Sequence, residues 1–156
     1  MAVTLQMARV PPAELDAARV SPTRLERVVG FDAVAASDYL DLDWARKGLL
    51  WLSERAGEPV ESAVRRALDG DATIDSAVDA GLGLYSEVSY VEPAGVAEVA
   101  FLLAGVDVEI FLAALPVDLD GFDGDPRDYL AGHVRALRGF YGEAAGRGLA
   151  VMVWWD

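Results

Sequence analysis

The chain ends in an apolar run, Leu149-Ala150-Val151-Met152-Val153-Trp154-Trp155, that constrains how the rest of the sequence folds. β-Branched and aromatic residues favour strands, and a short run this apolar is typical of a strand buried on both faces. An apolar strand at a sheet edge invites aggregation. We therefore predict that residues 149–155 form an interior strand of a sheet.

Two further segments have the character of strands. Val3–Val10 alternates apolar and mixed side chains, as a half-buried strand does, and Pro11 and Pro12 end it. Glu87–Val91 is a shorter candidate in the middle of the chain. The sequence thus predicts strands at both ends and one between them.

Helix signals fill the intervening segments. Prolines suited to a first helical turn stand at 12, 22, 59, 93 and 126, each followed by apolar residues at helical spacing. Leu40-Asp41-Leu42-Asp43 is expected to lead into a further helix that ends near Arg55, and a short helix is expected near 108–115. The clearest helix follows Asp125, with a buried stripe at Leu130, Val134, Leu137, Tyr141 and Ala144.

These elements predict one α+β domain over residues 1–156. In it a small antiparallel or mixed sheet, which includes the N- and C-terminal strands, is covered by several helices on one side. The chain has 156 residues, of which 53% are hydrophobic and 25% charged, which suffices for one hydrophobic core.

The net charge of −13 comes entirely from the middle of the chain. Between Ala67 and Pro126 there is no lysine or arginine, and there are 13 acidic residues: Asp69, Asp71, Asp75, Asp79, Glu87, Glu92, Glu98, Asp107, Glu109, Asp118, Asp120, Asp123 and Asp125. Binding to phosphates requires lysine and arginine, so we expect no nucleic-acid partner. An acidic surface either steers a basic partner or a cation toward it, or simply keeps the protein soluble.

The composition excludes several other classes. Without cysteine the chain has no disulfide, no thiolate nucleophile and no cysteine-ligated metal, and His133 is its single histidine. The longest apolar runs, Val99–Val106 and Ile110–Val117, are much shorter than the roughly 20 residues of a membrane span. The first residues lack the pattern of a secretory signal. We expect a cytoplasmic protein that does not bind membranes.

Three motifs resemble known sites only in part. Asp69-Gly70-Asp71-Ala72-Thr73 has the spacing of a phosphotransfer loop, but a helix precedes it instead of a buried strand, which favours a turn. Gly81–Ser86 lacks the third glycine and the βαβ unit of a nucleotide loop. Asp118, Asp120, Asp123 and Asp125 are weak metal candidates, because the ligands and the glycine that complete an EF-hand loop are missing. We therefore predict no metal site and no cofactor.

The histidine and the tryptophans allow two interpretations each. His133 lies near the edge of the last helix's stripe, where a structural role is favoured over that of a base. Trp44 and Trp51 are expected on one helical face, and Trp154 and Trp155 on opposite sides of a strand, so that one of the latter two can be exposed. Core packing is the default, but a partly exposed tryptophan beside acidic residues can anchor a partner.

Three segments in this order resemble the YfbM-like family, catalogued as domain of unknown function 1877. They are LDLDWARKGLLWL (40–52), YVEPAGVAEVA (90–100), and the end of the chain from Asp128 through RALRGFYGEAAGRG (135–148) to LAVMVWWD (149–156). The resemblance implies a single-domain α+β fold of small bacterial cytosolic proteins. It implies no reaction, because the family has no established activity.

These observations favour a non-enzymatic binding protein with an acidic surface, for example an immunity-type neutraliser of a basic protein partner. The alternative is a hydrolase or small-ligand enzyme that uses carboxylates, with or without a metal; a deep pocket lined by carboxyl groups of raised pKa would favour it. No catalytic residue can be assigned from the sequence. The chain is expected to be a monomer or a small homo-oligomer.

Overall fold

The computed structural model describes residues 3–75, 87–115 and 125–156. Its centre is a five-stranded sheet in the order β2-β1-β5-β4-β3, with every neighbouring pair antiparallel. The strands are β1 (Leu5–Val10), β2 (Tyr39–Asp41), β3 (Ala72–Thr73), β4 (Ser89–Val91) and β5 (Ala150–Trp155). The C-terminal strand β5 lies in the middle of the sheet, as its apolar sequence predicts.

The two terminal strands form the longest pairing of the sheet. β1 and β5 run antiparallel over six residue pairs, from Leu5 opposite Trp155 to Val10 opposite Ala150. Both strands are buried along almost their whole length. This pairing joins the two ends of the chain, and the shorter strands β2, β4 and β3 extend it on either side.

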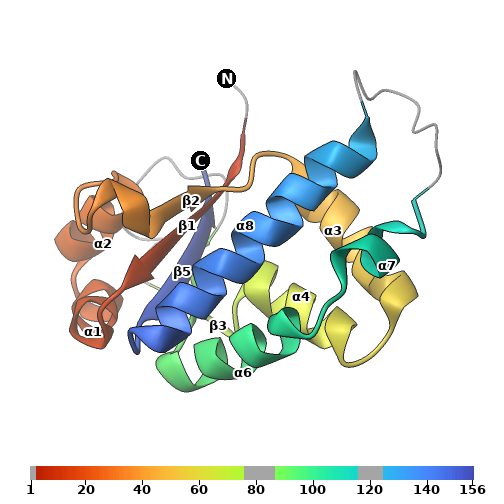
Figure 1. Cartoon of the computed structure of the whole chain (residues 1–156). Helices are drawn as coiled ribbons and strands as arrows, with labels where there is room; N and C mark the ends of the chain where they lie inside the picture. The colour runs from red at the N-terminus through yellow and green to blue at the C-terminus, as the bar shows by residue number, and fades with distance from the viewer. Residues whose placement is uncertain (1–2, 76–86, 116–124) are drawn as a thin grey trace.

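Helices cover both faces of the sheet, which corrects the prediction of a one-sided cover. Side chains of a strand alternate between the faces. Met7, Val151 and Val153 point into the larger core, with α3 (Ala45–Ala56), α4 (Val60–Asp69), α6 (Pro93–Ala104), α7 (Val108–Leu112) and α8 (Pro126–Gly146). Val10, Met152 and Trp154 point into a second, smaller core under α1 (Pro12–Val20) and α2 (Pro22–Val29). In Figure 1 these two helices lie on the other side of the sheet from α3, α4, α6 and α7.

Local sequence explains where the helices begin. The side chains of Ser21, Asp107 and Asp125 accept hydrogen bonds from backbone N–H groups in the first turns of α2, α7 and α8. Proline stands in the first turn of α1, α2, α6 and α8, where its missing N–H costs nothing. The stripe predicted for α8 is buried throughout.

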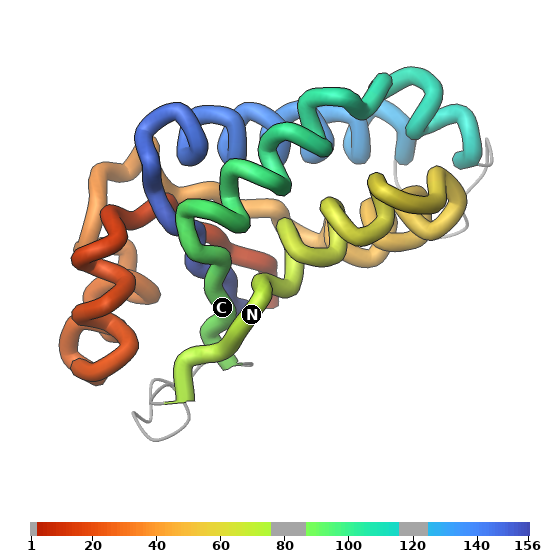
Figure 2. Tube along the Cα trace, turned by 90° about the horizontal axis from the view of Figure 1, so that it is seen from below, coloured from red at the N-terminus to blue at the C-terminus, as the bar shows by residue number. Residues whose placement is uncertain are grey.

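Two edge strands were not expected from the sequence. β2 occupies Tyr39–Asp41, within and just before the segment predicted only to lead into a helix, and a 3₁₀ turn at Ala36–Asp38 precedes it. β3 has two residues. Such short strands are too brief to show a period, and they form because β1 and β4 offer free backbone groups beside them. In the tube of Figure 2, seen from below, α6 crosses in front of α8, and α3 and α4 lie beside these two helices.

Candidate functional site

Trp44, the residue immediately before α3, has the most exposed side chain of the four tryptophans. Its side chain is 62% exposed, whereas Trp154 is 1% exposed. Trp44 precedes the first helical residue, Ala45, with a non-helical backbone. The expected shared face with Trp51 is therefore not formed by one helix: Trp51 is half-buried against the larger core, and the Arg55 guanidinium lies 3.2 Å from the centre of its ring.

A chain of hydrogen bonds holds Trp44 in place. The backbone N–H of Trp44 donates to the Tyr129 hydroxyl (3.2 Å), and that hydroxyl donates to Oδ2 of Asp43 (3.1 Å). The backbone N–H of Asp43 donates to Oδ1 of Asp41 (2.7 Å). Asp43 has a φ of 49°, a left-handed conformation that aspartate tolerates better than most residues. The turn before α3 and the first turns of α8 thus form one unit.

His133 completes this cluster one helical turn after Tyr129. The centres of the two rings are 4.5 Å apart, and the rings meet edge to face. Burial lowers the pKa of His133, and the nearby charges of Asp43 and Asp41 oppose that shift only in part. Burial, and then the hydrogen bond to Asp43, raise the pKa of Tyr129. Near neutral pH the imidazole and the phenol are uncharged, so Asp41 and Asp43 set the charge of the cluster.

This arrangement has groups that can attract a cation. An exposed indole offers an electron-rich face to ammonium and guanidinium groups, and carboxylates nearby strengthen the attraction. We call Asp41, Asp43, Trp44, Tyr129 and His133 the Trp44 site. Sequence analysis named the tryptophan and the histidine, but could not bring them together, because Trp44 reaches Tyr129, the neighbour of His133, only through the packing of α3 on α8.

That packing is unusually close at one point. A Cβ on Gly48 would lie 2.9 Å from a methyl group of Leu130, so the glycine lets α3 approach α8. Gly48 stands one turn after Trp44, and Leu130 is next to Tyr129. The close contact therefore fixes the distance between the two halves of the Trp44 site.

The acidic segment is partly neutralised by arginines from elsewhere in the chain. Arg46 bonds Asp69 (2.6 Å), and Arg66 bonds both Asp71 (2.7 Å) and Glu98 (2.8 Å). Longer ion pairs join Arg19 to Glu92 (3.6 Å) and Arg135 to Glu109 (3.7 Å). In the part of the chain that the structure describes, no three His, Cys, Asp or Glu side chains are placed to hold a metal.

The motifs that resembled known sites lie at helix ends and turns where the structure describes them. Asp69 is the last residue of α4, not the end of a buried strand, and Asp71 is bound to Arg66, as expected for a turn. Asp125 caps α8 by accepting from the backbone N–H of Arg127 (2.9 Å). Gly81–Ser86 and the weak metal candidates Asp118, Asp120 and Asp123 lie outside the described residues.

A hollow lined by several acidic groups lies between α7 and the start of α8. Its volume is about 450 Å³, and its charged lining consists of Glu109, Asp125, Asp128, Arg127 and Arg135. Arg127 donates to the backbone carbonyl of Leu115 (3.3 Å), and Asp125 is used as the cap. The three acidic residues of this lining stand among two arginines, so the hollow is not lined by carboxyl groups alone.

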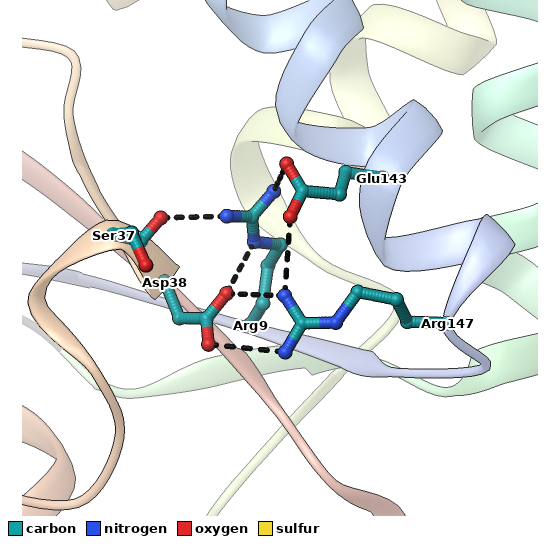
Figure 3. A network of polar contacts seen from close by, with 5 residues as sticks. All are labelled: Arg9, Ser37, Asp38, Glu143 and Arg147. Atoms are coloured by element: carbon teal, nitrogen blue, oxygen red, sulfur yellow. Dashed lines mark hydrogen bonds and ion pairs between the residues drawn. The ribbon is translucent and has the colours of Figure 1, made fainter.

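Sequence reasoning missed a buried network of charges, shown in Figure 3. Arg9, whose side chain is 5% exposed, donates from Nε to Oδ1 of Asp38 (3.0 Å) and pairs through Nη1 with Glu143 (2.8 Å). Arg147 holds both oxygens of Asp38, at 2.6 and 3.2 Å. The signal in the sequence was an arginine, Arg9, between the apolar residues Ala8 and Val10 of a predicted strand. The network joins β1, the 3₁₀ turn before β2, and the end of α8.

These elements define an α+β protein whose terminal strands pair at the centre of an antiparallel sheet. Its fold is that of YfbM from Escherichia coli, a protein of unknown function, with which it has a TM-score of 0.65, 9% sequence identity, and coverage of 98% of this chain and 99% of the other. At this identity the likeness establishes the fold, and it confirms the YfbM-like fold expected from the sequence. No family model and no curated protein matches the chain.

The comparison assigns no activity, because the structural neighbour is itself of unknown function. Within residues 3–75, 87–115 and 125–156, no helix combines the length and the apolarity needed to span a bilayer.

Proposed function

We propose that this chain is a non-enzymatic binding protein that recognises a basic protein partner, with the Trp44 site at the centre of the contact. The observation that carries the proposal is an indole that is 62% exposed and is carried by a backbone that hydrogen bonds tie to α8. Tryptophan is enriched among the residues that dominate binding energies. An immunity-type neutraliser of a basic toxin is one form that such a protein takes.

Rigidity of the Trp44 site supports this function. A backbone segment that is ordered before binding loses less entropy when a partner arrives. The Tyr129 hydroxyl bridges the backbone of Trp44 and the carboxylate of Asp43, so the turn that carries the indole is tied to α8. Among the residues that the structure describes, none forms a hydrogen bond with the indole of Trp44 that a partner would have to break.

The carboxylates beside Trp44 favour a partner that presents lysine or arginine side chains. Asp41 is exposed and Asp43 half-exposed, and both lie within three residues of Trp44. A lysine or arginine placed over the indole is stabilised by about 0.5–2 kcal/mol, depending on how far it is desolvated. The chain's net charge of −13 adds a longer-range attraction for basic proteins.

Replacing Trp44 by alanine tests the contact directly. We expect a hexa-arginine peptide to shift the indole N–H resonance of Trp44 in a titration followed by NMR, with that resonance assigned through Trp44→Phe. Trp44→Ala is expected to weaken binding roughly tenfold or more. The fold is retained, because the hydrogen bond of Trp44 uses its backbone. The matched control is Val20→Ala on α1, which removes another exposed apolar side chain (82% exposed) and leaves binding unchanged.

A pair of charge variants separates local from overall electrostatics. Asp41→Asn/Asp43→Asn keeps the side-chain acceptors and removes two charges, whereas Asp16→Asn/Asp32→Asn removes two charges on and after the first helices. We expect the first pair to weaken peptide binding and to reduce its salt dependence, and the second pair to have a much smaller effect. Equal effects of both pairs, or a hexa-arginine peptide that leaves the Trp44 resonance unmoved, would contradict the proposal.

Acidification should weaken the binding of a basic peptide through His133. The pKa of His133 lies below its ordinary value of 6.5, so the imidazole is neutral at pH 7 and gains a positive charge as the pH falls through that lowered pKa. The new charge repels the cation. We expect His133→Gln to lose the pH dependence between pH 7 and about 5 that the unaltered chain shows. Affinity measured by calorimetry across this interval checks the prediction; the same fall in both proteins would remove His133 from the site.

A further inference from the structure

We infer that the partner of this chain presents an acidic side chain beside its basic one, and that Lys47 is the residue that pairs with the acid. The inference rests on the proposed function, because it describes the partner of the Trp44 site more closely. Residues 3–75, 87–115 and 125–156 contain every lysine and arginine of the chain. Among these cationic residues Lys47, the single lysine, alone forms no hydrogen bond, ion pair or ring contact within the described chain. Every arginine forms at least one hydrogen bond or ion pair.

Lys47 lies beside Trp44 on the surface. Trp44 is the residue before α3 and Lys47 is the third residue of that helix, and side chains at these two positions are neighbours across the first helical turn. Both residues are exposed. The indole therefore has two carboxylates, those of Asp41 and Asp43, on the chain before it and an ammonium group on the helix after it.

The local structure does not neutralise Lys47. The first turn of a helix is its positive end and favours acidic residues, but the first turn of α3 contains none. Arg46, in the same turn, is compensated by Asp69 (2.6 Å). The carboxylates of Asp41 and Asp43 accept hydrogen bonds from within the Trp44 site, and neither forms an ion pair with Lys47. Lys47 therefore keeps an uncompensated positive charge at a position where its own helix disfavours one.

A uniformly basic partner surface does not complement this arrangement. A cation over the indole is attracted by Asp41 and Asp43, but a second cation over the first turn of α3 is repelled by Lys47. A carboxylate in that second place is attracted by Lys47 and by the positive end of the helix. The matching surface is therefore mixed, with a lysine or arginine over Trp44 and an aspartate or glutamate over Lys47. Lys47 thereby determines specificity, because it disfavours basic partners that lack the acid.

A double-mutant cycle between the chain and a peptide tests this pairing. The probes are Arg-Arg-Arg-Gly-Gly-Glu and Arg-Arg-Arg-Gly-Gly-Gln, with both ends blocked so that the glutamate is the one carboxyl group. Their binding is followed by NMR through the indole N–H of Trp44 at one salt concentration. The ratio of the two dissociation constants, that of the glutamine peptide over that of the glutamate peptide, should be roughly threefold larger for the unaltered chain than for Lys47→Gln. This variant keeps the fold, because Lys47 is exposed and bonds no described residue.

Arg27→Gln is the matched control. It removes the same charge from an exposed residue of α2, on the other face of the sheet, where the side chain donates to the backbone carbonyl of Asp32 (3.1 Å). Its ratio of dissociation constants should equal that of the unaltered chain. Hexa-arginine gives a second readout: Lys47→Gln should bind it about twofold more tightly than Arg27→Gln does, because a repulsion between neighbouring cations has been removed.

Equal ratios for the unaltered chain and Lys47→Gln overturn this inference, and so does an Arg27→Gln variant whose ratio falls as far. Hexa-arginine separates the inference from the proposed function. If hexa-arginine shifts the Trp44 resonance while the ratios stay equal, the Trp44 site binds cations and Lys47 takes no part in selecting them. If no peptide shifts that resonance, the proposed function fails and this inference fails with it.

Discussion

Asp38→Ala is expected to lower the free energy of unfolding by about 1–3 kcal/mol, because the buried Arg9 loses one of its two carboxylate partners and keeps only Glu143 (2.8 Å). Asp38 is 7% exposed and receives hydrogen bonds from both Arg9 and Arg147. After the substitution, Arg147 can turn into solvent, since 45% of its side chain is already exposed. Arg9 cannot, because it is held under the end of α8 with its guanidinium 4.7 Å from the centre of the Phe140 ring.

Chemical denaturation of Asp38→Ala and of Asp32→Ala measures this effect. Asp32 is an exposed aspartate in the same connection, so its loss should change stability by less than about 0.5 kcal/mol. The double variant Arg9→Met/Asp38→Ala should recover most of the lost stability, because it also removes the buried positive charge. If the double variant is no more stable than Asp38→Ala, the charge of an Arg9 left with Glu143 alone is not the cause of the destabilisation.

The same network predicts how stability depends on pH. The hydrogen bonds from Arg147, together with the charges of Arg147 and Arg9, hold the pKa of Asp38 below its ordinary value of 3.8, although burial opposes them. A carboxyl whose pKa is lower in the folded state stabilises the protein above its unfolded pKa and loses that contribution as the pH falls through its folded pKa. The difference in stability between the unaltered chain and Asp38→Asn should therefore be constant near neutral pH and shrink below about pH 4.

Most of the architecture could be predicted from the sequence because its signals are local. Prolines and capping residues mark where α1, α2, α6 and α8 begin, and the composition of residues 150–155 places β5 inside the sheet. The sequence did not predict that α1 and α2 cover the second face of the sheet. Leu25 and Val28 of α2 show that this helix needs a core, but not which face of the sheet provides it. That choice depends on the alternation of β1 and β5, whose residues are buried on both faces.

The candidate sites were less predictable, since each is made by residues distant in the sequence. Asp43 and Tyr129 are 86 residues apart, and Asp38 and Arg147 are 109 apart. The solvent exposure of individual tryptophans could not be predicted either, because nothing in the sequence distinguishes Trp44, which is 62% exposed, from the buried Trp154. The acidic segment was visible as a charge pattern, but its pairing with Arg46, Arg66 and Arg19 depends on helix packing.

Gly70→Ala is expected to be the most damaging of the glycine substitutions, and Gly57→Ala is its natural control. Gly57 and Gly70 end α3 and α4 with nearly the same backbone, φ 74° and ψ −175° against φ 73° and ψ 176°. This region is almost exclusive to glycine, and a side chain there costs about 1–3 kcal/mol. Both substitutions therefore carry the same conformational penalty.

The surroundings of the two glycines differ. A Cβ on Gly57 meets nothing within 4 Å, whereas a Cβ on Gly70 would lie 2.7 Å from Cβ of Ser89 and 2.9 Å from the backbone nitrogen of Tyr90. Those atoms belong to β4, so relief requires the end of α4 to move away from the sheet. The overpacking adds roughly another 1–3 kcal/mol.

Urea denaturation of both variants isolates the steric part of the cost. The difference in unfolding free energy between Gly70→Ala and Gly57→Ala cancels the shared backbone penalty and leaves the cost of separating α4 from β4. The backbone N–H of Asp71, which donates to the carbonyl of Tyr90 (2.9 Å), should then exchange faster with solvent in Gly70→Ala alone. Equal losses of stability in the two variants would mean that the conformation of Gly70, and not its close approach to β4, is what the fold requires.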